Sequence, residues 1–135
     1  MQSKTRILVI DDNSTIMSIV KANLAGKGYE VLCADCGYDG LDMAVAGAPD
    51  AIVLDRIMPD LDGNEVLQRL KQDNGTKNIP VMMMTGKNKA EDIADSLKLG
   101  AADYIVKPFI IEDFLIRIEK MMDVLDGSSK AEAAE

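Results

Sequence analysis

The sequence contains no histidine and only two cysteines, Cys33 and Cys36. A structural zinc site needs four cysteine or histidine ligands, so two thiols cannot complete one. The pair forms a C-x-x-C motif, a spacing that redox proteins also use. A redox role would place Cys36 at a helix start, where the helix dipole lowers a thiol pKa. Because Cys33 falls inside a predicted strand and nothing else supports redox chemistry, we interpret both cysteines as structural.

The sequence also lacks any apolar run close to the roughly 20 residues of a transmembrane helix. It has no positively charged segment followed by the apolar stretch of a secretion signal. These absences exclude an integral membrane protein of the helical type. We expect a cytoplasmic protein without a membrane anchor of its own.

Positive charge is scarce, with 15 lysines and arginines against 23 aspartates and glutamates and a net charge of −8. Such a surface repels nucleic acid phosphates and anionic lipids, so we predict that the chain binds neither directly. The acidity suits basic patches on protein partners, or it serves only solubility. The 135 residues, 47% of them hydrophobic and 28% charged, fit one ordinary globular domain.

Short apolar runs alternate with segments of helical periodicity along the chain. The runs predict strands at residues 6–10, 30–34, 51–55, 80–85 and 103–106, and the periodic segments predict helices at 13–27, 40–46, 64–72, 89–99 and 110–125. This alternation predicts an α/β fold in which five helices cover both faces of a five-stranded parallel sheet. We expect one domain over residues 1–127, with 128–135 as a disordered tail or the start of a linker.

Polar residues follow four of the predicted strands: the pair Asp11-Asp12, then Asp55, Thr85 and Lys107. The carboxyl ends of parallel strands open onto one crevice, so these side chains should meet there. Two carboxylates about 4 Å apart repel by about 4 kcal/mol at an effective dielectric constant near 20. A hard cation removes this repulsion, and Mg²⁺ is typically held by one or two carboxylates together with water and phosphate oxygens. The sequence therefore predicts a magnesium site.

Asp55 stands alone at the end of the central strand. A carboxylate in this place can attack phosphorus and become an aspartyl phosphate. Mg²⁺ would neutralise charge on the phosphoryl oxygens. Lys107 would add a second positive charge, and the Thr85 hydroxyl would donate a hydrogen bond.

Together these motifs resemble the receiver domain of two-component response regulators, and the chain is similar in size to the stand-alone chemotaxis regulators. The resemblance covers residues 4–125 and rests on Asp11-Asp12, Leu54-Asp55, Met58-Pro59-x-x-x-Gly63, Thr85-Gly86, Gly100-Ala101-x-x-Tyr104 and Lys107-Pro108-Phe109. It implies the flavodoxin-like strand order 2-1-3-4-5.

The resemblance also implies a function. A sensor histidine kinase or a phosphotransfer protein would phosphorylate Asp55, with Mg²⁺ held by Asp12, Asp55 and the backbone carbonyl of Ile57. Asp11 would act largely through metal-bound water. The protein would not be a conventional enzyme, but a phosphoacceptor that assists its own phosphotransfer and dephosphorylation.

A switch follows from the same resemblance. On phosphorylation, Thr85 would move toward the phosphoryl group and Tyr104 would swing inward. The face formed by the fourth helix, fifth strand and fifth helix would change, and with it the binding of a downstream protein target. For Tyr104 the alternative is an aromatic that only covers the core.

One departure from the family pattern concerns phosphoryl lifetime. The position two residues after Asp55, which is polar in many relatives and helps to orient the hydrolytic water, is Ile57. Isoleucine cannot hydrogen-bond water, so we hypothesise a long-lived phosphoryl group. Lys87, two residues after Thr85, either shields the phosphate or recruits solvent.

Other functions remain as alternatives. The chain fits a receiver cut from a longer regulator with a DNA-binding or enzymatic output domain. A haloacid-dehalogenase-like phosphatase is disfavoured because its second aspartate would stand at Ile57, and a flavodoxin because Asp11-Asp12 would repel the FMN phosphate. A receiver that works without phosphate is disfavoured because all the site residues are present.

Overall fold

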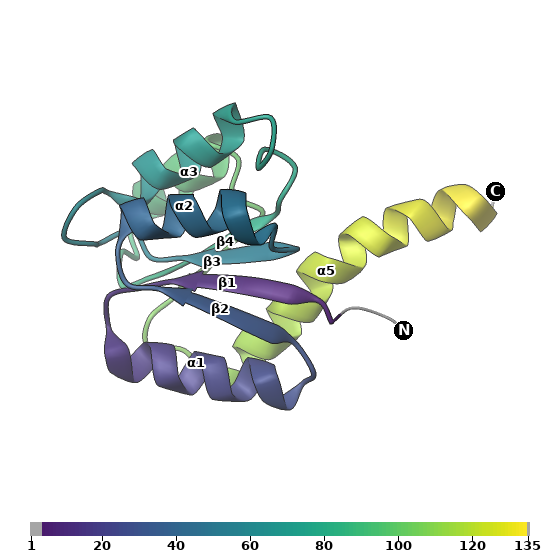
Figure 1. Cartoon of the computed structure of the whole chain (residues 1–135), viewed down its shortest axis with the longest axis horizontal. Coiled ribbons are helices and arrows are strands. Elements are labelled where there is room, and N and C mark those ends of the chain that lie inside the picture. The colour runs from purple at the N-terminus through teal and green to yellow at the C-terminus, as the bar shows by residue number, and fades with distance from the viewer. Residues whose placement is uncertain (1–3, 135) are drawn as a thin grey trace.

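The computed structural model describes residues 4–134 as one parallel sheet covered by helices on both faces (Figure 1). The strands are β1 (Arg6–Ile10), β2 (Glu30–Ala34), β3 (Ala51–Leu54), β4 (Val81–Thr85) and β5 (Asp103–Val106). The helices are α1 (Ser14–Gly26), α2 (Gly37–Gly47), α3 (Gly63–Gln72), α4 (Ala90–Lys98) and α5 (Ile111–Ala134). The sheet order is β2-β1-β3-β4-β5, and all strand pairs are parallel. The predicted doubly wound α/β fold with strand order 2-1-3-4-5 is confirmed.

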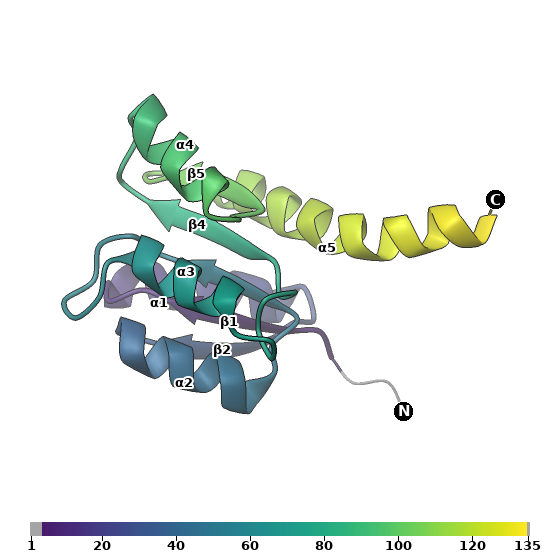
Figure 2. The same ribbon diagram turned by 90° about the horizontal axis from the view of Figure 1, so that it is seen from above.

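Two apolar cores lie on opposite faces of the sheet because successive strand residues point in opposite directions. In β1, Ile7 and Val9 join the core under α1 and α5, whereas Leu8 and Ile10 join the core under α2 and α3. Figure 1 shows α2 and α3 on one side of the sheet and α1 on the other, and Figure 2 looks down on the side of α2 and α3. β3 and β4 are buried along their whole length, as expected of central parallel strands.

The three consecutive methionines of β4 fill both cores. Met82 and Met84 pack on the α1 and α5 side, and Met83 packs on the other. All three are fully buried. The three methionines are therefore core residues of a central strand.

Two helices differ from the prediction by more than one residue at an end. α2 begins at Gly37, three residues before the predicted start, because the Asp60 carboxylate accepts hydrogen bonds from the N–H groups of Gly37 and Tyr38, both at 2.8 Å. α5 continues to Ala134, so the prediction that it ends at residue 125 was wrong. Lysine, alanine and glutamate in its last turns favour a helix, and no proline interrupts it. The division of the chain at residue 127 stays a prediction.

Parallel strands place the loops after β1, β3, β4 and β5 at one edge of the sheet, where the polar residues of the sequence analysis lie. The sheet pattern extends one residue past two strands. Asp11 N–H donates to the Ala34 carbonyl at 3.1 Å, and Asp55 N–H donates to the Ile10 carbonyl at 3.0 Å. The backbone of both aspartates is therefore fixed by the sheet. Within residues 4–134, no helix is both long and apolar enough to span a bilayer.

Candidate functional site

Three carboxylates gather at the carboxyl ends of β1 and β3. Oxygen atoms of Asp11, Asp12 and Asp55 lie within 4.8 Å of one another. Asp11 is 1% exposed and Asp55 is 6% exposed, whereas Asp12 is exposed. The cluster therefore has a buried floor and a side open to solvent.

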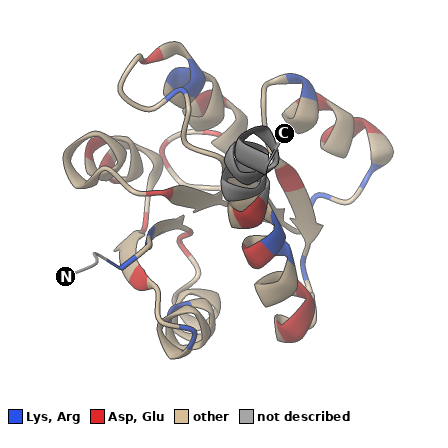
Figure 3. Ribbon diagram, turned by 90° about the vertical axis from the view of Figure 1, so that its right-hand side faces the viewer, with Lys and Arg blue, Asp and Glu red and all other residues tan. Residues whose placement is uncertain are grey.

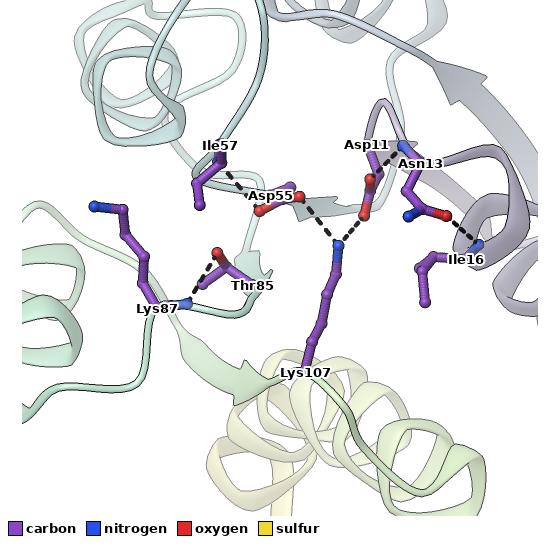
Figure 4. A network of polar contacts seen from close by, with 8 residues as sticks. All are labelled: Asp11, Asn13, Ile16, Asp55, Ile57, Thr85, Lys87 and Lys107. Carbon is purple, nitrogen blue, oxygen red and sulfur yellow. Dashed lines mark hydrogen bonds and ion pairs between the residues drawn. The ribbon is translucent and has the colours of Figure 1, made fainter.

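Lys107, after β5, joins two of these carboxylates. Its Nζ lies 2.7 Å from Asp11 Oδ2 and 3.0 Å from Asp55 Oδ2 (Figure 4). Asp11 Oδ1 accepts a further hydrogen bond from the Asn13 N–H group at 2.8 Å, while the Asn13 side chain caps α1 by accepting from the Ile16 N–H group. The start of α1 and the acidic cluster are thus built from the same loop.

The pKa values of Asp11 and Lys107 are each set by burial and by the opposite charge of their partners. Burial raises the pKa of Asp11, and the hydrogen bonds from Lys107 and the Asn13 N–H group offset only part of that rise. For Lys107, burial alone would lower the pKa, but the hydrogen bonds and charges of Asp11 and Asp55 outweigh it and raise the pKa. The lysine is therefore held in its charged form by two buried acids.

The donor set fits a small divalent cation. Three carboxylates converge and only the Lys107 ammonium group is paired with them, which leaves uncompensated negative charge within the described residues. All the converging acceptors are oxygens, the ligands that Mg²⁺ prefers. Beside the cluster, on the α1 and α2 side, a cavity of about 510 Å³ is lined by Asp11, Asp12 and Asp35 among other residues, so solvent reaches two of the three carboxylates. The residues of this pocket fit the predicted magnesium ion.

Thr85 and Tyr104 lie on the β4 and β5 side of the pocket. Thr85 is fully buried, and Figure 4 shows its hydroxyl facing the same opening as Asp55. The Lys87 N–H group donates to Thr85 Oγ1 at 3.4 Å. Tyr104 is 7% exposed, and its hydroxyl donates to the Lys87 carbonyl at 2.6 Å. The ring predicted to swing inward on phosphorylation is already inward in this structure.

Ile57 lies at the mouth of the pocket. Its N–H group donates to Asp55 Oδ1 at 3.2 Å, and its side chain is 58% exposed. Figure 4 shows this side chain on the same side of the pocket as Lys87. An apolar side chain and an ammonium group therefore lie on the same side of Asp55.

The structure brings together the strand-end residues that the sequence analysis selected, but two contributing residues were missed. Arg56 is buried, and its Nη1 donates to the Asp92 carbonyl in α4 at 3.2 Å. Asp60 accepts from the Gly37, Tyr38 and Leu61 N–H groups. Each looks like a solvent-exposed loop charge in the sequence, and no local pattern distinguishes it.

The cysteines carry no sign of reactivity. Cys33 and Cys36 are both free and half-buried. At Cys36 the N–H group of Asp39 lowers the pKa, but desolvation and the nearby carboxylates of Asp39 and Asp60 outweigh it, so the thiol pKa is raised. Burial likewise raises the pKa of Cys33. Raised pKa values leave little thiolate, in keeping with the structural interpretation.

Comparison with known sequences gives consistent matches. The profile of the response regulator receiver domain matches residues 7–119. The DNA-binding dual master transcriptional regulator RpaA of Synechocystis sp. is 41% identical over 126 residues, which are 93% of this chain and 52% of that protein. The response regulator MprA of Mycobacterium tuberculosis is 37% identical over 118 residues, 87% of this chain and 50% of that protein. The chain spans about half the length of these curated relatives.

A solved structure matches over nearly the whole chain. The CheY-like response regulator receiver domain protein from Methanospirillum hungatei has a TM-score of 0.87 and 30% sequence identity, and the match covers 93% of this chain and 99% of that one. The fold and the sequence profile thus point to the same class of domain.

Proposed function

The chain belongs to the response regulator receiver family of two-component signalling, and from this we propose that it accepts a phosphoryl group on Asp55 from a histidine kinase or a phosphotransfer protein. The observation that carries the proposal is the contact of Asp55 with Lys107 inside a cluster of three carboxylates. A buried carboxylate beside a fixed ammonium and a cation site is what phosphoryl acceptance requires.

The proposed step is an in-line displacement at phosphorus. A carboxylate oxygen of Asp55 forms the new bond to phosphorus as the phosphorus–nitrogen bond of a phosphohistidine breaks, and the leaving imidazole takes up a proton. Lys107 supplies a fixed positive charge to one phosphoryl oxygen, and the Thr85 hydroxyl donates to another. Asp12, Asp55 and the Ile57 carbonyl would hold Mg²⁺, which supplies further positive charge when bound.

Phosphorylation would be read through Thr85. In this structure Thr85 Oγ1 accepts only the long 3.4 Å hydrogen bond from the Lys87 N–H group, so the hydroxyl is free to donate to a phosphoryl oxygen. A contact that exists only in the phosphorylated state shifts a population of conformations. The face of α4, β5 and α5 is the one that a downstream protein target would read.

We predict that Thr85→Ala still accepts phosphate on Asp55 but responds to it poorly. The expected result is a loss of most of the phosphorylation-dependent gain in partner affinity, measured by titration of a partner with phosphorylated wild type and variant. Equal gains in affinity for the two proteins would exclude this role of Thr85.

The phosphoacceptor is tested with a small-molecule phosphodonor and mass spectrometry. Wild type incubated with the donor and Mg²⁺ should gain the mass of one phosphoryl group, and Asp55→Asn should gain none. Asp42→Asn is the matched control, because Asp42 is exposed in α2 and lines the neighbouring cavity. Wild type that gains no phosphoryl group, or Asp55→Asn that gains as much as wild type, would refute the assignment.

A second proposal concerns the setting of the domain. The chain covers 52% of RpaA, a DNA-binding regulator, and 50% of MprA. We propose that residues 1–127 act as the receiver of a longer cytoplasmic regulator of this kind, with 128–135 leading to an output domain. The reading frame beyond residue 135 tests this, and a stop codon there would favour a stand-alone regulator.

A further inference from the structure

Arg56, the residue directly after Asp55, is a buried cation outside the acidic cluster. It is 7% exposed, and its Nη1 donates to the Asp92 carbonyl at 3.2 Å and lies 3.6 Å from Asp92 Oδ1. Its Nε is buried and is the one such side-chain atom without a hydrogen-bond partner within the described part of the chain. Burying a charged group with an unused hydrogen-bond donor costs folding free energy, which suggests that Arg56 has a role beyond stability.

The backbone of Arg56 is held as firmly as its side chain. The Gly63 N–H group, at the start of α3, donates to the Arg56 carbonyl at 2.7 Å. A Cβ atom at Gly63 would lie 2.5 Å from the Arg56 Cα and 2.2 Å from the Asp55 carbonyl oxygen. The loop that carries Asp55 and Arg56 is therefore pressed against α3, and the arginine side chain extends from a fixed base.

The other end of the contact, α4, is weakly anchored. Ser96 is the buried residue of this helix, and its hydroxyl donates to Asn64 Oδ1 at 2.7 Å. Ile93 is only half-buried against the core. An element with little apolar burial opens easily. The contact between Arg56 and Asp92 therefore contributes a large part of the stabilisation that keeps α4 packed in place.

Arg56 also lies beside Tyr104. Burial raises the pKa of the Tyr104 hydroxyl, and the Arg56 side chain offsets part of this rise by hydrogen bonding and by its charge. The same hydroxyl donates to the Lys87 carbonyl in the loop before α4. Arg56 thus contacts the first turn of α4 directly, and Tyr104 contacts the loop that precedes it.

We propose that Arg56 is a positioning residue that ties the Asp55 loop to the first turn of α4, the helix that follows the loop to which Tyr104 is hydrogen-bonded. The inference rests on the proposed function only where it involves phosphorylation. Phosphorylation turns the singly charged Asp55 carboxylate into an acyl phosphate of about −2 charge, so about one negative charge is added next to Arg56, and the phosphoryl oxygens compete with Asp92 for the guanidinium. The unused Nε–H is the donor available for that competition, so phosphorylation loosens the first turn of α4.

Hydrogen exchange of α4 in the full chain tests the tether. Arg56→Met keeps an unbranched side chain of similar reach and removes the charge, and it leaves Asp92, which is partly exposed, to be solvated. The amides of α4 should exchange about tenfold faster in Arg56→Met than in wild type, within the range of ordinary coupling energies. Arg69→Met is the matched control, because Arg69 forms an exposed ion pair with Glu65 on α3. The control should leave α4 exchange unchanged.

Phosphorylation with a small-molecule donor and Mg²⁺ supplies the second comparison. In wild type it should accelerate exchange in α4, and in Arg56→Met this acceleration should fall by more than half. Arg56→Lys, which keeps a charge and one donor for the Asp92 carbonyl, should recover part of the protection. A ring-labelled sample should show the signal of Tyr104, one of three tyrosines, shifted in Arg56→Met.

The outcomes separate the two proposals. Failure of wild type to gain a phosphoryl group refutes the proposed function. Hydrogen exchange of α4 in the unphosphorylated proteins still tests the contact between Arg56 and α4. If Arg56→Met does not fold, Arg56→Leu replaces it, because it removes the donor to the Asp92 carbonyl and the charge together. Unchanged α4 exchange in a folded Arg56→Met, or in Arg56→Leu if that variant is used, overturns the inference.

Discussion

Lys107 is the residue on which the electrostatics of the pocket depend, because its ammonium contacts two buried acids from different strands. Lys107→Met leaves both carboxylates without this partner. We expect the free energy of unfolding at neutral pH to fall by about 2–3 kcal/mol and phosphorylation of Asp55 to slow by about 100-fold. Denaturant unfolding and phosphorylation time courses measure the two effects.

The pH dependence of the Lys107 contribution has a definite sign. The pKa of Lys107 is raised above 10.5 in the folded state, so its stabilisation is fully present below that pH and is lost as the pH rises through the folded pKa. The stability difference between wild type and Lys107→Met should therefore shrink above about pH 10.5. A difference that grows with pH in this range contradicts the assignment of the ion pair.

A further prediction at the residue scale is that Ile57 controls the access of water to Asp55. Its exposed side chain cannot orient water, whereas asparagine can. Ile57→Asn should shorten the lifetime of the phosphoryl group by about tenfold, a typical contribution of one positioned polar group. Release of phosphate from the purified phosphoprotein measures the lifetime, and equal rates for the two proteins would remove the hypothesis. Ile116→Asn, at an exposed isoleucine of α5, is the matched control.

The carboxylates, the hydroxyl and the ammonium of the pocket could be predicted because each stands where a strand ends. Strand ends are visible in the sequence as the limit of an apolar run, and parallel strands bring these limits together. Arg56 and Asp60 follow no such rule. Their roles depend on partners in α4 and α2 that are 36 and 22 or 23 residues away, and a lone charge in a loop carries no sign of those partners.

At the scale of elements, the start of α3 depends on Gly63. A side chain there would meet the backbone of Asp55 and Arg56 at 2.2–2.5 Å, too close for any small adjustment. Gly63→Ala should lower the free energy of unfolding by about 2 kcal/mol or more and slow phosphorylation, because the Asp55 loop must move. Gly26→Ala, in the last turn of α1 with open space around it, should be neutral or slightly stabilising. Thermal melts of the two variants give the comparison.

The start of α2 depends on Asp60 in the same manner. Hydrogen bonds from the N–H groups of Tyr38, Gly37 and Leu61 lower the pKa of Asp60 to about 2. Its stabilisation is therefore present above an unfolded pKa near 4 and is lost as the pH falls toward 2. Asp60→Ala should lower the melting temperature at pH 7 and remove this part of the acid sensitivity. Asp73→Ala, at another loop aspartate that accepts a backbone hydrogen bond, is the comparison variant.

Helix ends were the part of the fold that the sequence predicted least well. The periodicity of α2 becomes visible only at residue 40, whereas its first turn is fixed by Asp60 across the β3–α3 loop. α5 shows the opposite case, because local helix propensity extends it beyond its last periodic apolar residue. The strand order needed the family resemblance, since five buried strands alone permit several orders.

At the scale of the whole molecule, both the net negative charge and the acidic cluster of the pocket attract cations. In Figure 3, acidic positions occur on elements all round the molecule, with basic positions interspersed among them. The net charge of −8 attracts cations generally, but only the cluster of Asp11, Asp12 and Asp55 offers converging oxygens beside a buried lysine within the described residues. A cation that binds there should stabilise the fold as a whole, because the unfolded chain has no such cluster.

Our last prediction is that Mg²⁺ stabilises the folded protein by binding at the acidic cluster. Burial raises the pKa of Asp11, so its ionisation opposes folding as the pH rises from about 3.8 through the folded pKa. Mg²⁺ relieves it, and at about 100 times its dissociation constant it should add about 2.7 kcal/mol to the free energy of unfolding. Thermal melts at pH 7.5 with MgCl₂, against KCl at matched ionic strength, measure the gain. Asp12→Asn should lose most of it and Asp42→Asn none, because only Asp12 belongs to the cluster. If KCl and MgCl₂ stabilise equally, the charge of the surface and not the pocket is responsible, and the magnesium site is refuted.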